Sequence, residues 1–330
     1  MVTRILKWGI LGTARINRAL IPPLNISPRN KLLAVASRDL ARAQSYAAAE
    51  DIERAYGNYE ALLADPEIDV VYISLPNNLH VGWSIRAAAA GKHVLCEKPL
   101  ALSVEEVDRV AEAAHQHGVV VAEAFMYRHH PQTLKVVELI NEGAIGRLRI
   151  VRGGFTFMLD RPEDIRLKPE LGGGSIWDVG CYPISYARTA AGGIAPEEVF
   201  GWQELGPTGI DIAFFGQMRF PGGVIAQIDS GFNSEYRTVM EFIGDRGRIT
   251  VPKSFKPDRE SHLYLRKGDA AHEKIHFADQ ELYLGEVEDL YDAAVYGKPQ
   301  RVSLNDTRQN IATIRALLAS AERGALVKLE

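Results

Sequence analysis

The sequence has few cysteines, no long apolar run and no excess of either charge. Only Cys96 and Cys181 are cysteines, which argues against a disulfide framework and is typical of a protein in a reducing cytosol. No stretch reaches the roughly 18 uninterrupted apolar residues that a membrane-spanning helix needs. Lys and Arg number 38 and Asp and Glu number 42, which gives a net charge of −4 and a pI of about 6.2. A nucleic-acid partner would normally require a basic patch or a high pI, so none is expected.

The length and the start of the chain narrow the class further. At roughly 150 residues per domain, 330 residues predict about two domains. The first residues enter a strand-like run directly, without an apolar segment followed by a small-residue cleavage site, so we expect no export signal. Together these features predict a soluble, cytoplasmic, two-domain protein that acts on small molecules and has no membrane partner.

The first part of the chain alternates between short apolar strands and helices. Pro22 and Pro23 are expected to kink or restart the first helix. Strands separated by helices of 10–15 residues predict βαβ units, and therefore a Rossmann-type parallel sheet with right-handed crossovers. The expected strands cover 5–11, 32–36, 69–75, 93–97 and 119–122, and the expected helices cover 14–20, 39–50, 81–90 and 103–117.

The turn after the first strand is a degenerate form of the G-x-G-x-x-G phosphate turn. Gly12 allows the tight turn, but Ala14 and Asn17 replace the second and third glycines. Alone, the motif fits a strand–helix turn without ligand equally well. Its place in the first βα unit favours a dinucleotide, with the pyrophosphate on backbone N–H groups at the helix start. The residues expected to contact the cofactor here are Gly12, Thr13, Ala14, Arg15 and Ile16.

The end of the second strand carries Ser37, Arg38 and Asp39, with Arg42 one helical turn later. A small hydroxyl followed by arginine suits the 2′-phosphate of NADP, because a guanidinium pairs with phosphate oxygens. A solvated helix start capped by Asp39 is the alternative explanation. NADP is therefore expected, and NAD stays open because Asp39 is a carboxylate near the position that would bind its ribose.

Two later strand ends carry further candidate residues. Lys98 leaves a strand and precedes a proline that fixes the backbone, so we expect its ammonium to point into the crevice at the strand ends. It is either a surface charge or a catalytic group, and its position favours the second. Asn and Pro at these ends are also ordinary turn residues. The further cofactor-binding candidates are Leu75, Pro76, Asn77, His80, Glu97 and Lys98.

The second part of the chain changes to alternating strands with few helices. This pattern predicts an α+β domain with a large, mostly antiparallel sheet and helices on one face. The seam is expected near Ala124, so the predicted domains are 1–124, which binds the dinucleotide, and 125–330, which binds substrate and forms oligomers. The expected strands cover 147–157, 199–205, 211–220, 224–231, 238–243 and 248–251, and a final helix covers 303–323.

A glycine-rich segment, Gly172–Gly174, precedes an expected helix that carries Asp178 and Tyr182. Their i, i+4 spacing places both side chains on one helix face, where a carboxylate could bind hydroxyl groups and a phenol could move a proton. On spacing alone, an ordinary helix after a glycine-rich loop is the better explanation.

Four motifs together resemble the glucose–fructose oxidoreductase / inositol dehydrogenase / rhizopine-catabolism (Gfo/Idh/MocA) family over essentially the whole chain. They are the glycine turn near the start, Glu97-Lys98-Pro99, the segment 123–128, and Gly172–Gly174 followed by Asp178 and Tyr182. Inositol dehydrogenases have a histidine where this chain has Tyr182. In this respect the chain is similar to the branch that contains dimeric dihydrodiol dehydrogenase and D-xylose 1-dehydrogenase. The resemblance implies a homodimer, or a dimer of dimers, formed through the open face of the sheet.

The resemblance and the residues together predict hydride transfer between NAD(P) and a carbinol or carbonyl carbon of a sugar, sugar derivative or vicinal diol. Tyr182 is expected to be the acid/base, and the ammonium of Lys98 would lower the phenol pKa from its usual ~10. The reverse assignment, with Lys98 as the base, stays open. No metal is required. The expected substrate-binding residues are Asp178, Tyr127, Arg128 and His130.

Two other functions are compatible with the same motifs. One is a glycosidase that uses NAD for transient oxidation of its substrate, as a branch of the family does. The other is a non-catalytic NADP-binding regulator, which the presence of both Lys98 and Tyr182 argues against.

Overall fold

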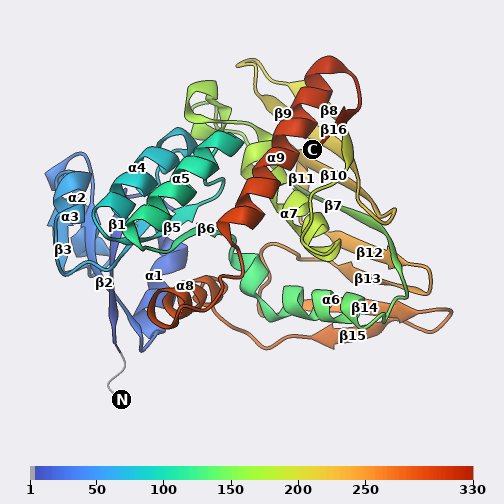
Figure 1. Ribbon diagram of the computed structural model, residues 1–330, viewed down its shortest axis with the longest axis horizontal. Helices are drawn as coiled ribbons and strands as arrows, with labels where there is room; N and C mark the ends of the chain where they lie inside the picture. Colours follow the sequence, from blue (N-terminus) through green and yellow to red (C-terminus); the bar gives the residue numbers. More distant parts are fainter. Residues whose placement is uncertain (1–3, 330) are drawn as a thin grey trace. The chain divides into compact units, whose positions relative to one another are not determined.

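The computed structural model describes residues 4–329, and its internal packing divides the chain into two compact units (Figure 1). The first unit runs to Met126 and also includes Tyr283–Thr307; the second consists of Tyr127–Leu282 and the segment from Arg308 onward. The expected seam near Ala124 lies two residues from the first crossing point. The packing differs from the predicted division in one segment, because 283–307 belongs with the first unit.

The first unit contains a parallel sheet whose described strands follow the order β3-β2-β1-β4-β5-β6. All four residues of β4 and five of six in β1 are buried, as expected for strands covered on both faces. The order reverses between β1 and β4, which is where doubly wound sheets bind ligands. The strands are β1 (Leu6–Leu11), β2 (Asn30–Ala36), β3 (Arg54–Tyr56), β4 (Val70–Ile73), β5 (His93–Glu97) and β6 (Val121–Ala124).

The helices of this sheet begin and end largely where the sequence predicts. The Asp39 carboxylate caps α2 by accepting the N–H of Arg42 at 2.7 Å, and Gly118 ends α5 in the left-handed conformation. The first helix does not restart at its prolines: α1 continues through Pro22 and Pro23, because the prolines remove two N–H donors but keep a helical φ. The helices are α1 (Asn17–Ile26), α2 (Leu40–Ala49), α3 (Tyr59–Leu63), α4 (Asn77–Ala89) and α5 (Val104–His117).

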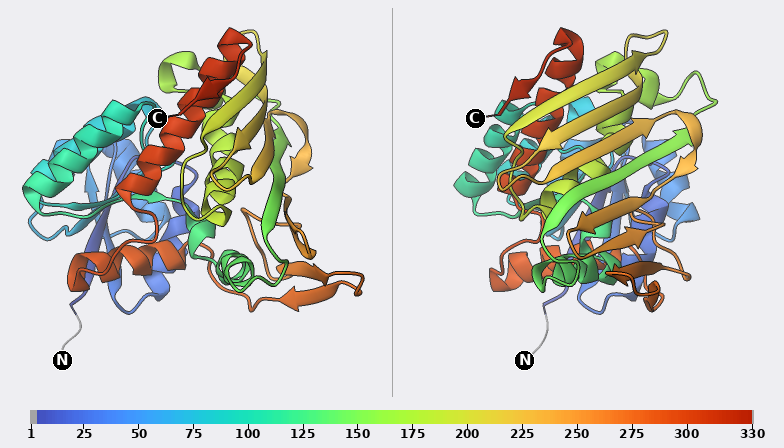
Figure 2. Two further views of the ribbon diagram at one scale, coloured as in Figure 1. Left: turned by 45° about the vertical axis from the view of Figure 1, so that its right-hand side comes forward. Right: turned by 90° about the vertical axis from the view of Figure 1, so that its right-hand side faces the viewer.

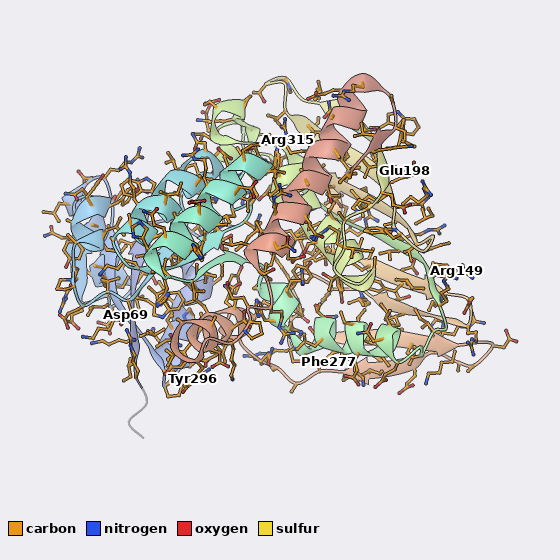
Figure 3. The ribbon with its side chains drawn as sticks, viewed as in Figure 1. Asp69, Arg149, Glu198, Phe277, Tyr296 and Arg315 are labelled. Atoms are coloured by element: carbon orange, nitrogen blue, oxygen red, sulfur yellow. The ribbon has the colours of Figure 1, made fainter. Side chains whose placement is uncertain are left out.

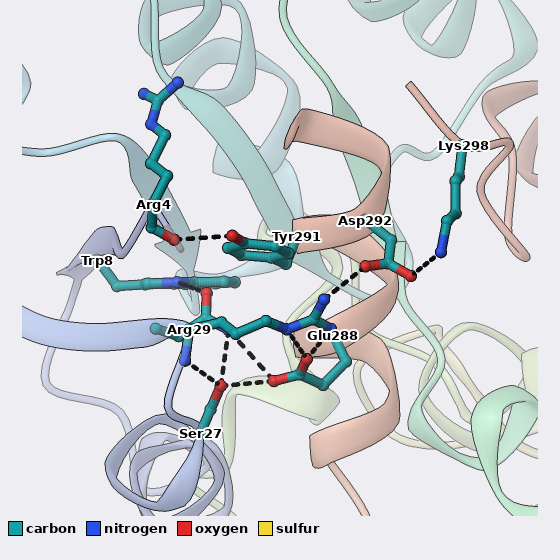
Figure 4. Close-up of polar contacts among 9 residues, drawn as sticks. Arg4, Trp8, Ser27, Arg29, Glu288, Tyr291, Asp292 and Lys298 are labelled. Carbon is teal, nitrogen blue, oxygen red and sulfur yellow. Dashed lines mark hydrogen bonds and ion pairs between the residues drawn. The ribbon is translucent and has the colours of Figure 1, made fainter. Parts of the chain in front are cut away.

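Helix α8 (Leu284–Tyr296) returns to the first unit and is fixed there by a polar network (Figure 4). Arg29, from the turn before β2, pairs with Glu288 and, at 2.8 Å, with Asp292. The hydroxyl of Tyr291 donates to the carbonyl of Arg4 at 2.7 Å. These contacts join residues more than 250 positions apart, which no local sequence pattern indicates.

The second unit is built on a large sheet that contains ten described strands. Its order is β15-β14-β13-β12-β7-β10-β9-β8-β16, with β11 also paired to β7. Only β7 and β10 pair in parallel, so the predicted, mostly antiparallel sheet is confirmed for the described residues. The strands are β7 (Leu148–Met158), β8 (Glu198–Leu205), β9 (Asp211–Arg219), β10 (Ile225–Gly231), β11 (Asn233–Arg237), β12 (Met240–Gly244), β13 (Gly247–Val251), β14 (His262–Lys267), β15 (Glu273–His276) and β16 (Val327–Lys328).

Helices cover one face of this sheet. Besides α6 (Pro131–Asn141), the second unit has α7 (Cys181–Ala190), which packs on β7 and β10, and α9 (Leu304–Arg323), whose Ser320 hydroxyl accepts the N–H of Gly201 at 3.0 Å. In the right-hand view of Figure 2 no helix crosses in front of the sheet. Trp202 and Phe215 on that face are 67% and 53% exposed.

A polar contact joins two neighbouring strands of the large sheet at their ends. Glu198, labelled in Figure 3, accepts from Arg219 on the neighbouring strand at 2.6 Å.

Among residues 4–329 no helix is long and apolar enough to cross a membrane.

Candidate functional site

The turn after β1 has the backbone geometry that a phosphate turn needs. Gly12 has φ +99°, and a Cβ on it would lie 3.0 Å from a methyl carbon of Leu75, so glycine is required at this position. Asn17, in the place of the third glycine, donates to the Gly12 carbonyl at 3.0 Å. The Asn17 side chain thus fixes the turn, which explains how the motif tolerates its departure from glycine.

The start of α1 fits an anion. No side chain caps this helix, and its first turn carries no acidic residue. The N–H groups of Asn17, Arg18 and Ala19 already donate to the carbonyls of Ala14, Arg15 and Ile16, so a phosphate would meet the helix dipole and the backbone of the turn that precedes α1. The backbone of Thr13–Ile16 therefore fits the pyrophosphate of a dinucleotide.

Of the two arginines predicted at the second strand end, Arg42 lies beside this turn. The Arg42 guanidinium donates to the Thr13 hydroxyl at 2.8 Å and so joins the two loops. Burial raises the pKa of Tyr59, and the positive charges of Arg38 and Arg42 both oppose that rise. Ser37 is buried, and its N–H donates to the Tyr56 carbonyl at 3.0 Å.

His80 joins the loops that follow β4 and β5. Its Nδ1 lies 2.8 Å from the Pro99 carbonyl and its Nε2 lies 2.7 Å from the Leu75 carbonyl. Burial lowers the pKa of this imidazole, and the positive charge of Lys98 lowers it further. The side chain is completely buried, so it fixes the backbone on both sides of the strand ends. Pro76 and Asn77 form the start of α4.

The loop that carries Lys98 is held from both directions by buried groups. Before it, the Tyr72 hydroxyl donates to Glu97 at 2.6 Å. After it, the buried Glu123 carboxylate accepts the N–H of Leu100 at 2.9 Å and the hydroxyl of Thr307 at 2.8 Å. These bonds fix the backbone on each side of Lys98.

A buried carboxyl group from α8 lies near this loop and was not predicted. Glu286 is 2% exposed, and neither of its carboxyl oxygens has a hydrogen-bond partner among the described residues. Burial raises the pKa of Glu286 well above its usual range, and the Glu97 carboxylate raises it further. Burial raises the pKa of Tyr283, and the carboxyl groups of Glu97 and Glu286 raise it further. Glu286 was not predicted because no helix was expected over 284–296.

In the second unit, the segment after the three glycines is a π-helical turn, η4 (Ile176–Gly180), which continues into α7. The prediction of one regular α-helix from Asp178 to Tyr182 is therefore wrong, although the residues remain four apart. Turns of this kind are rare and occur frequently at functional sites.

Asp178 is held by an arginine that the sequence analysis did not assign to the site. The Arg166 Nε donates to the Asp178 carboxylate at 2.7 Å, and its Nη1 donates to Asp164 at 3.0 Å. The charge of Asp178 is the largest cause of the raised pKa of Arg166. Arg166 thereby stabilises the ionised form of Asp178 and fixes its orientation.

Tyr182 lies at the start of α7 within a group of aromatic rings, and it is 5% exposed. The ring centroids of Tyr127, Phe155 and Phe255 lie at 5.8, 5.5 and 5.4 Å. The Tyr127 hydroxyl donates to the Tyr182 carbonyl at 3.4 Å. These rings fix the position of the phenol.

Three of the predicted substrate-binding residues are buried and make structural contacts. Tyr127 is 0% exposed, and Arg128 donates to the Ser185 hydroxyl at 3.1 Å. His130 caps α6 by accepting the N–H of Gln132, and burial lowers its pKa to about 4. Their contact with substrate stays a prediction.

Each unit thus offers a different chemistry. The first offers a backbone cradle for phosphate and, beside it, the loop that carries Lys98. The second offers a carboxylate on Asp178 and a phenol on Tyr182, within one short segment. Among residues 4–329 no three His, Cys, Asp or Glu side chains are grouped as a metal ion would require.

Comparison with known proteins identifies both parts of the chain. Residues 6–125 match the oxidoreductase family with an NAD-binding Rossmann fold, and residues 133–250 match the GFO/IDH/MocA C-terminal domain. The chain is 38% identical over 329 residues to D-xylose 1-dehydrogenase (NADP(+)) 2 of Haloferax volcanii, covering 98% of this chain and 99% of that protein.

Solved structures agree with this assignment. A 3-ketoreductase from Actinomadura kijaniata, crystallised with NADP and TDP-benzene, is 29% identical with a TM-score of 0.90, covering 96% of this chain and 98% of that one. Aldose-aldose oxidoreductase from Caulobacter crescentus is 25% identical with a TM-score of 0.91, covering 99% of this chain and 100% of that one. The expected family, fold and class of enzyme are confirmed: the chain belongs to the GFO/IDH/MocA family of NAD(P)-dependent oxidoreductases.

Proposed function

We propose that the protein transfers a hydride between NADP and a carbinol or carbonyl carbon of a sugar, a sugar derivative or a vicinal diol. The observation that carries the proposal is the pair of segments described above, an uncapped phosphate turn and the Asp178–Tyr182 segment. Relatives with this architecture are named as D-xylose and dihydrodiol dehydrogenases and as reductases of a dTDP-linked keto sugar.

The preference for NADP is supported by how the carboxylate near the second strand end is used. In an NAD-specific site, an acid at this place binds the ribose hydroxyls. Asp39 instead caps α2, and its oxygen accepts the N–H of Arg42. Arg38 and Arg42 supply the positive charge that a 2′-phosphate requires.

In the proposed mechanism, Tyr182 moves the proton. The turn 12–16, with Arg38 and Arg42, would hold NADP, which would supply the hydride donor for reduction or the hydride acceptor for oxidation. Tyr182 takes the hydroxyl proton in oxidation and returns it in reduction. The Lys98 ammonium stabilises both the phenolate and the alkoxide-like oxygen of the substrate. Asp178, oriented by Arg166, accepts hydrogen bonds from neighbouring substrate hydroxyls.

Several buried residues serve this chemistry by positioning other groups. His80 and Glu123 fix the loops on each side of the Lys98 backbone. His80 was expected to contact the cofactor directly, and we now propose that it acts through the Leu75 and Pro99 carbonyls. Tyr127 supports Tyr182 in the same way.

We also propose that two copies of the chain associate through the bare face of the large sheet, as a homodimer or as a dimer of dimers. A depression of about 610 Å³ lies on this face and is lined in part by Trp202, Phe215, Arg237 and Glu241. Exposed aromatic residues beside both signs of charge suit a self-complementary contact. Light scattering of Trp202→Lys should show the mass of a smaller assembly than the wild type; equal masses would refute the proposed interface. The cytoplasmic location stays a prediction.

A substrate panel tests the proposed activity. Aldoses and trans-diols are followed at the nicotinamide absorbance with NADP and NAD in parallel, and keto sugars with NADPH and NADH. We expect turnover of at least one sugar-like substrate, with the higher kcat/KM for NADP. Net conversion of a glycoside without a change in absorbance would instead indicate the glycosidase. Cofactor binding without turnover of any substrate would indicate the regulator.

A further inference from the structure

A buried carboxylate outside the predicted site lies beneath the π-helical turn. Asp211, the first residue of β9, is 5% exposed. Among the described residues no lysine or arginine forms an ion pair with it. A buried carboxylate without a cation partner reduces stability, so its presence calls for a reason other than stability.

The Asp211 carboxylate is hydrogen-bonded to the start of η4. Its Oδ2 accepts the hydroxyl of Ser175 at 2.7 Å and the N–H of Ile176 at 2.7 Å. The Ser175 hydroxyl also lies 3.0 Å from the hydroxyl of Ser230, on the neighbouring strand β10. Asp211, Ser175 and Ser230 therefore form one buried polar group, which we call the Asp211 cluster.

The backbone of the turn is shaped to fit this cluster. A Cβ on Gly174, which has φ +126°, would lie 2.3 Å from the Oδ1 of Asp211. At the other end of η4, a Cβ on Gly180 would lie 2.9 Å from the Ser230 hydroxyl. The turn thus rests on the cluster at both ends, and a larger residue at either glycine would have to displace a side chain of the cluster.

The chemistry of the cluster depends on the negative charge. Burial raises the pKa of Asp211 to about 6, and the bonds from Ser175 and Ile176 oppose that rise. The group is therefore mainly ionised at neutral pH, when its Oδ2 accepts two hydrogen bonds at once. An asparagine has a single acceptor oxygen and no charge, so it would hold Ser175 and Ile176 less firmly.

We propose that Asp211 is a positioning residue for the reaction: through Ser175 and Ile176 it fixes the π-helical turn, and so presents Asp178 and Tyr182 to the substrate. Asp178 is in the turn itself, and its N–H donates to the Gly174 carbonyl at 3.0 Å. Tyr182 follows two residues after the turn ends. This role rests on the proposed function for its kinetic part, whereas the fixing of the turn does not.

The test compares Asp211→Asn with the wild type by hydrogen exchange and by kinetics. Asp269→Asn, at an exposed turn between β14 and β15, is the matched control. We expect amides of residues 174–182 to exchange at least tenfold faster in Asp211→Asn, with exchange in β9 and β10 unchanged. The kcat/KM for the sugar should fall by about 10²-fold, the size of effect expected when a reacting group is misplaced. The Kd for NADPH should stay within twofold, and so should every value for Asp269→Asn.

Three outcomes would overturn the role. One is unchanged exchange, and another is faster exchange with unchanged kcat/KM, which would make Asp211 purely structural. The third is an equal loss of NADPH binding and sugar turnover, which would indicate general unfolding. If Asp211→Asn does not fold, Ser175→Ala removes one donor and should shift the same readouts in the same direction by less. If the wild type turns over no sugar, the proposed function fails, while the exchange data still test whether Asp211 fixes the turn.

Discussion

The two units build their parts of the candidate site from different materials. In the first unit the phosphate turn is made of backbone, with Gly12 at positive φ and an uncapped helix start. In the second unit the proposed chemistry depends on the side chains of Asp178 and Tyr182, held by Arg166 and by a buried aromatic group. The first part depends on backbone conformation, whereas the second depends on a few particular side chains.

This difference determines what each unit indicates about the cofactor and the substrate. A backbone cradle recognises what all dinucleotides share, so the phosphate turn identifies the class of cofactor even with Ala14 and Asn17 in place of glycine. Side chains recognise what distinguishes one substrate from another. The identity of the substrate therefore depends on the second unit, and variants should separate cofactor binding from turnover.

The largest separation should come from Lys98→Met. Loss of the ammonium should lower kcat by about 10³-fold, because the phenolate and the alkoxide-like oxygen both lose stabilisation. NADPH binding, measured by fluorescence titration, should change by less than fivefold. Lys92→Met is the control, because buried Lys92 donates to the Asp65 and Ile68 carbonyls and should affect stability alone. A kcat within threefold of the wild type in Lys98→Met would remove Lys98 from the mechanism.

Gly174→Ala should break the second unit's part of the site without affecting the first. The new methyl group would collide with Asp211, and we expect a loss of about 10²-fold in kcat/KM with little change in NADPH affinity. Gly192 also has a positive φ, +95° against +126° for Gly174, but nothing lies within 4 Å of a Cβ built on it, so Gly192→Ala introduces backbone strain alone. Equal kinetics in the two variants would show that backbone strain, and not the collision, is what matters.

The first unit should respond to Arg38→Ala and Arg42→Ala in the opposite way. Each variant should weaken NADPH binding by about tenfold, the value of one charge-assisted hydrogen bond to phosphate, and leave NADH binding unchanged. Arg86→Ala, on the exposed face of α4, is the control. Parallel titrations with both cofactors check this, and equal losses for NADPH and NADH would contradict a 2′-phosphate contact.

His130→Asn should have the smallest effect at neutral pH, and it should appear in the free energy of unfolding. The effect is small because asparagine also caps helices well. The folded-state pKa of His130, about 4, lies below its usual 6.5, so the unfolded chain binds the proton more readily. The wild type should therefore lose stability as the pH falls from 6.5 to 4, by at most about 3 kcal/mol from this residue.

Asparagine removes that titration, so His130→Asn should lose less stability over the same interval in urea unfolding. The raised pKa of Asp211 acts in the opposite direction, since it adds stability as the pH falls from about 6, but it is common to both proteins. Parallel pH curves for the two proteins would show that His130 does not titrate in this way.

The fold was predictable wherever local patterns determine it. The strand and helix alternation, the Asp39 cap and the Gly118 helix end all follow from nearby residues. Helix α8 was missed, although Val287, Leu290 and Tyr291 have helical spacing and are buried. Its return to the first unit depends on Arg29 meeting Glu288, which is a property of the folded chain alone.

The candidate site was predictable as a set of residues but not as an arrangement. Lys98, Asp178 and Tyr182 were identified from motifs and resemblance, whereas their supports were not. Asp211 and Glu286 are isolated acids in the sequence. They become candidates for a functional role only in the fold, which buries Asp211 beside η4 and Glu286 near the loop after β5. The π-helical turn follows a glycine run that is equally compatible with a regular helix.

The most direct test of the account is the rate of hydride transfer in a single turnover by Tyr182→Phe, with saturating NADPH and a keto sugar that the wild type reduces. Tyr186→Phe, one turn along the same buried helix, is the matched control. We predict that Tyr182→Phe binds NADPH normally but transfers hydride about 10³-fold more slowly, while Tyr186→Phe stays within threefold of the wild type. Transfer by Tyr182→Phe at a rate near the wild type would contradict the account.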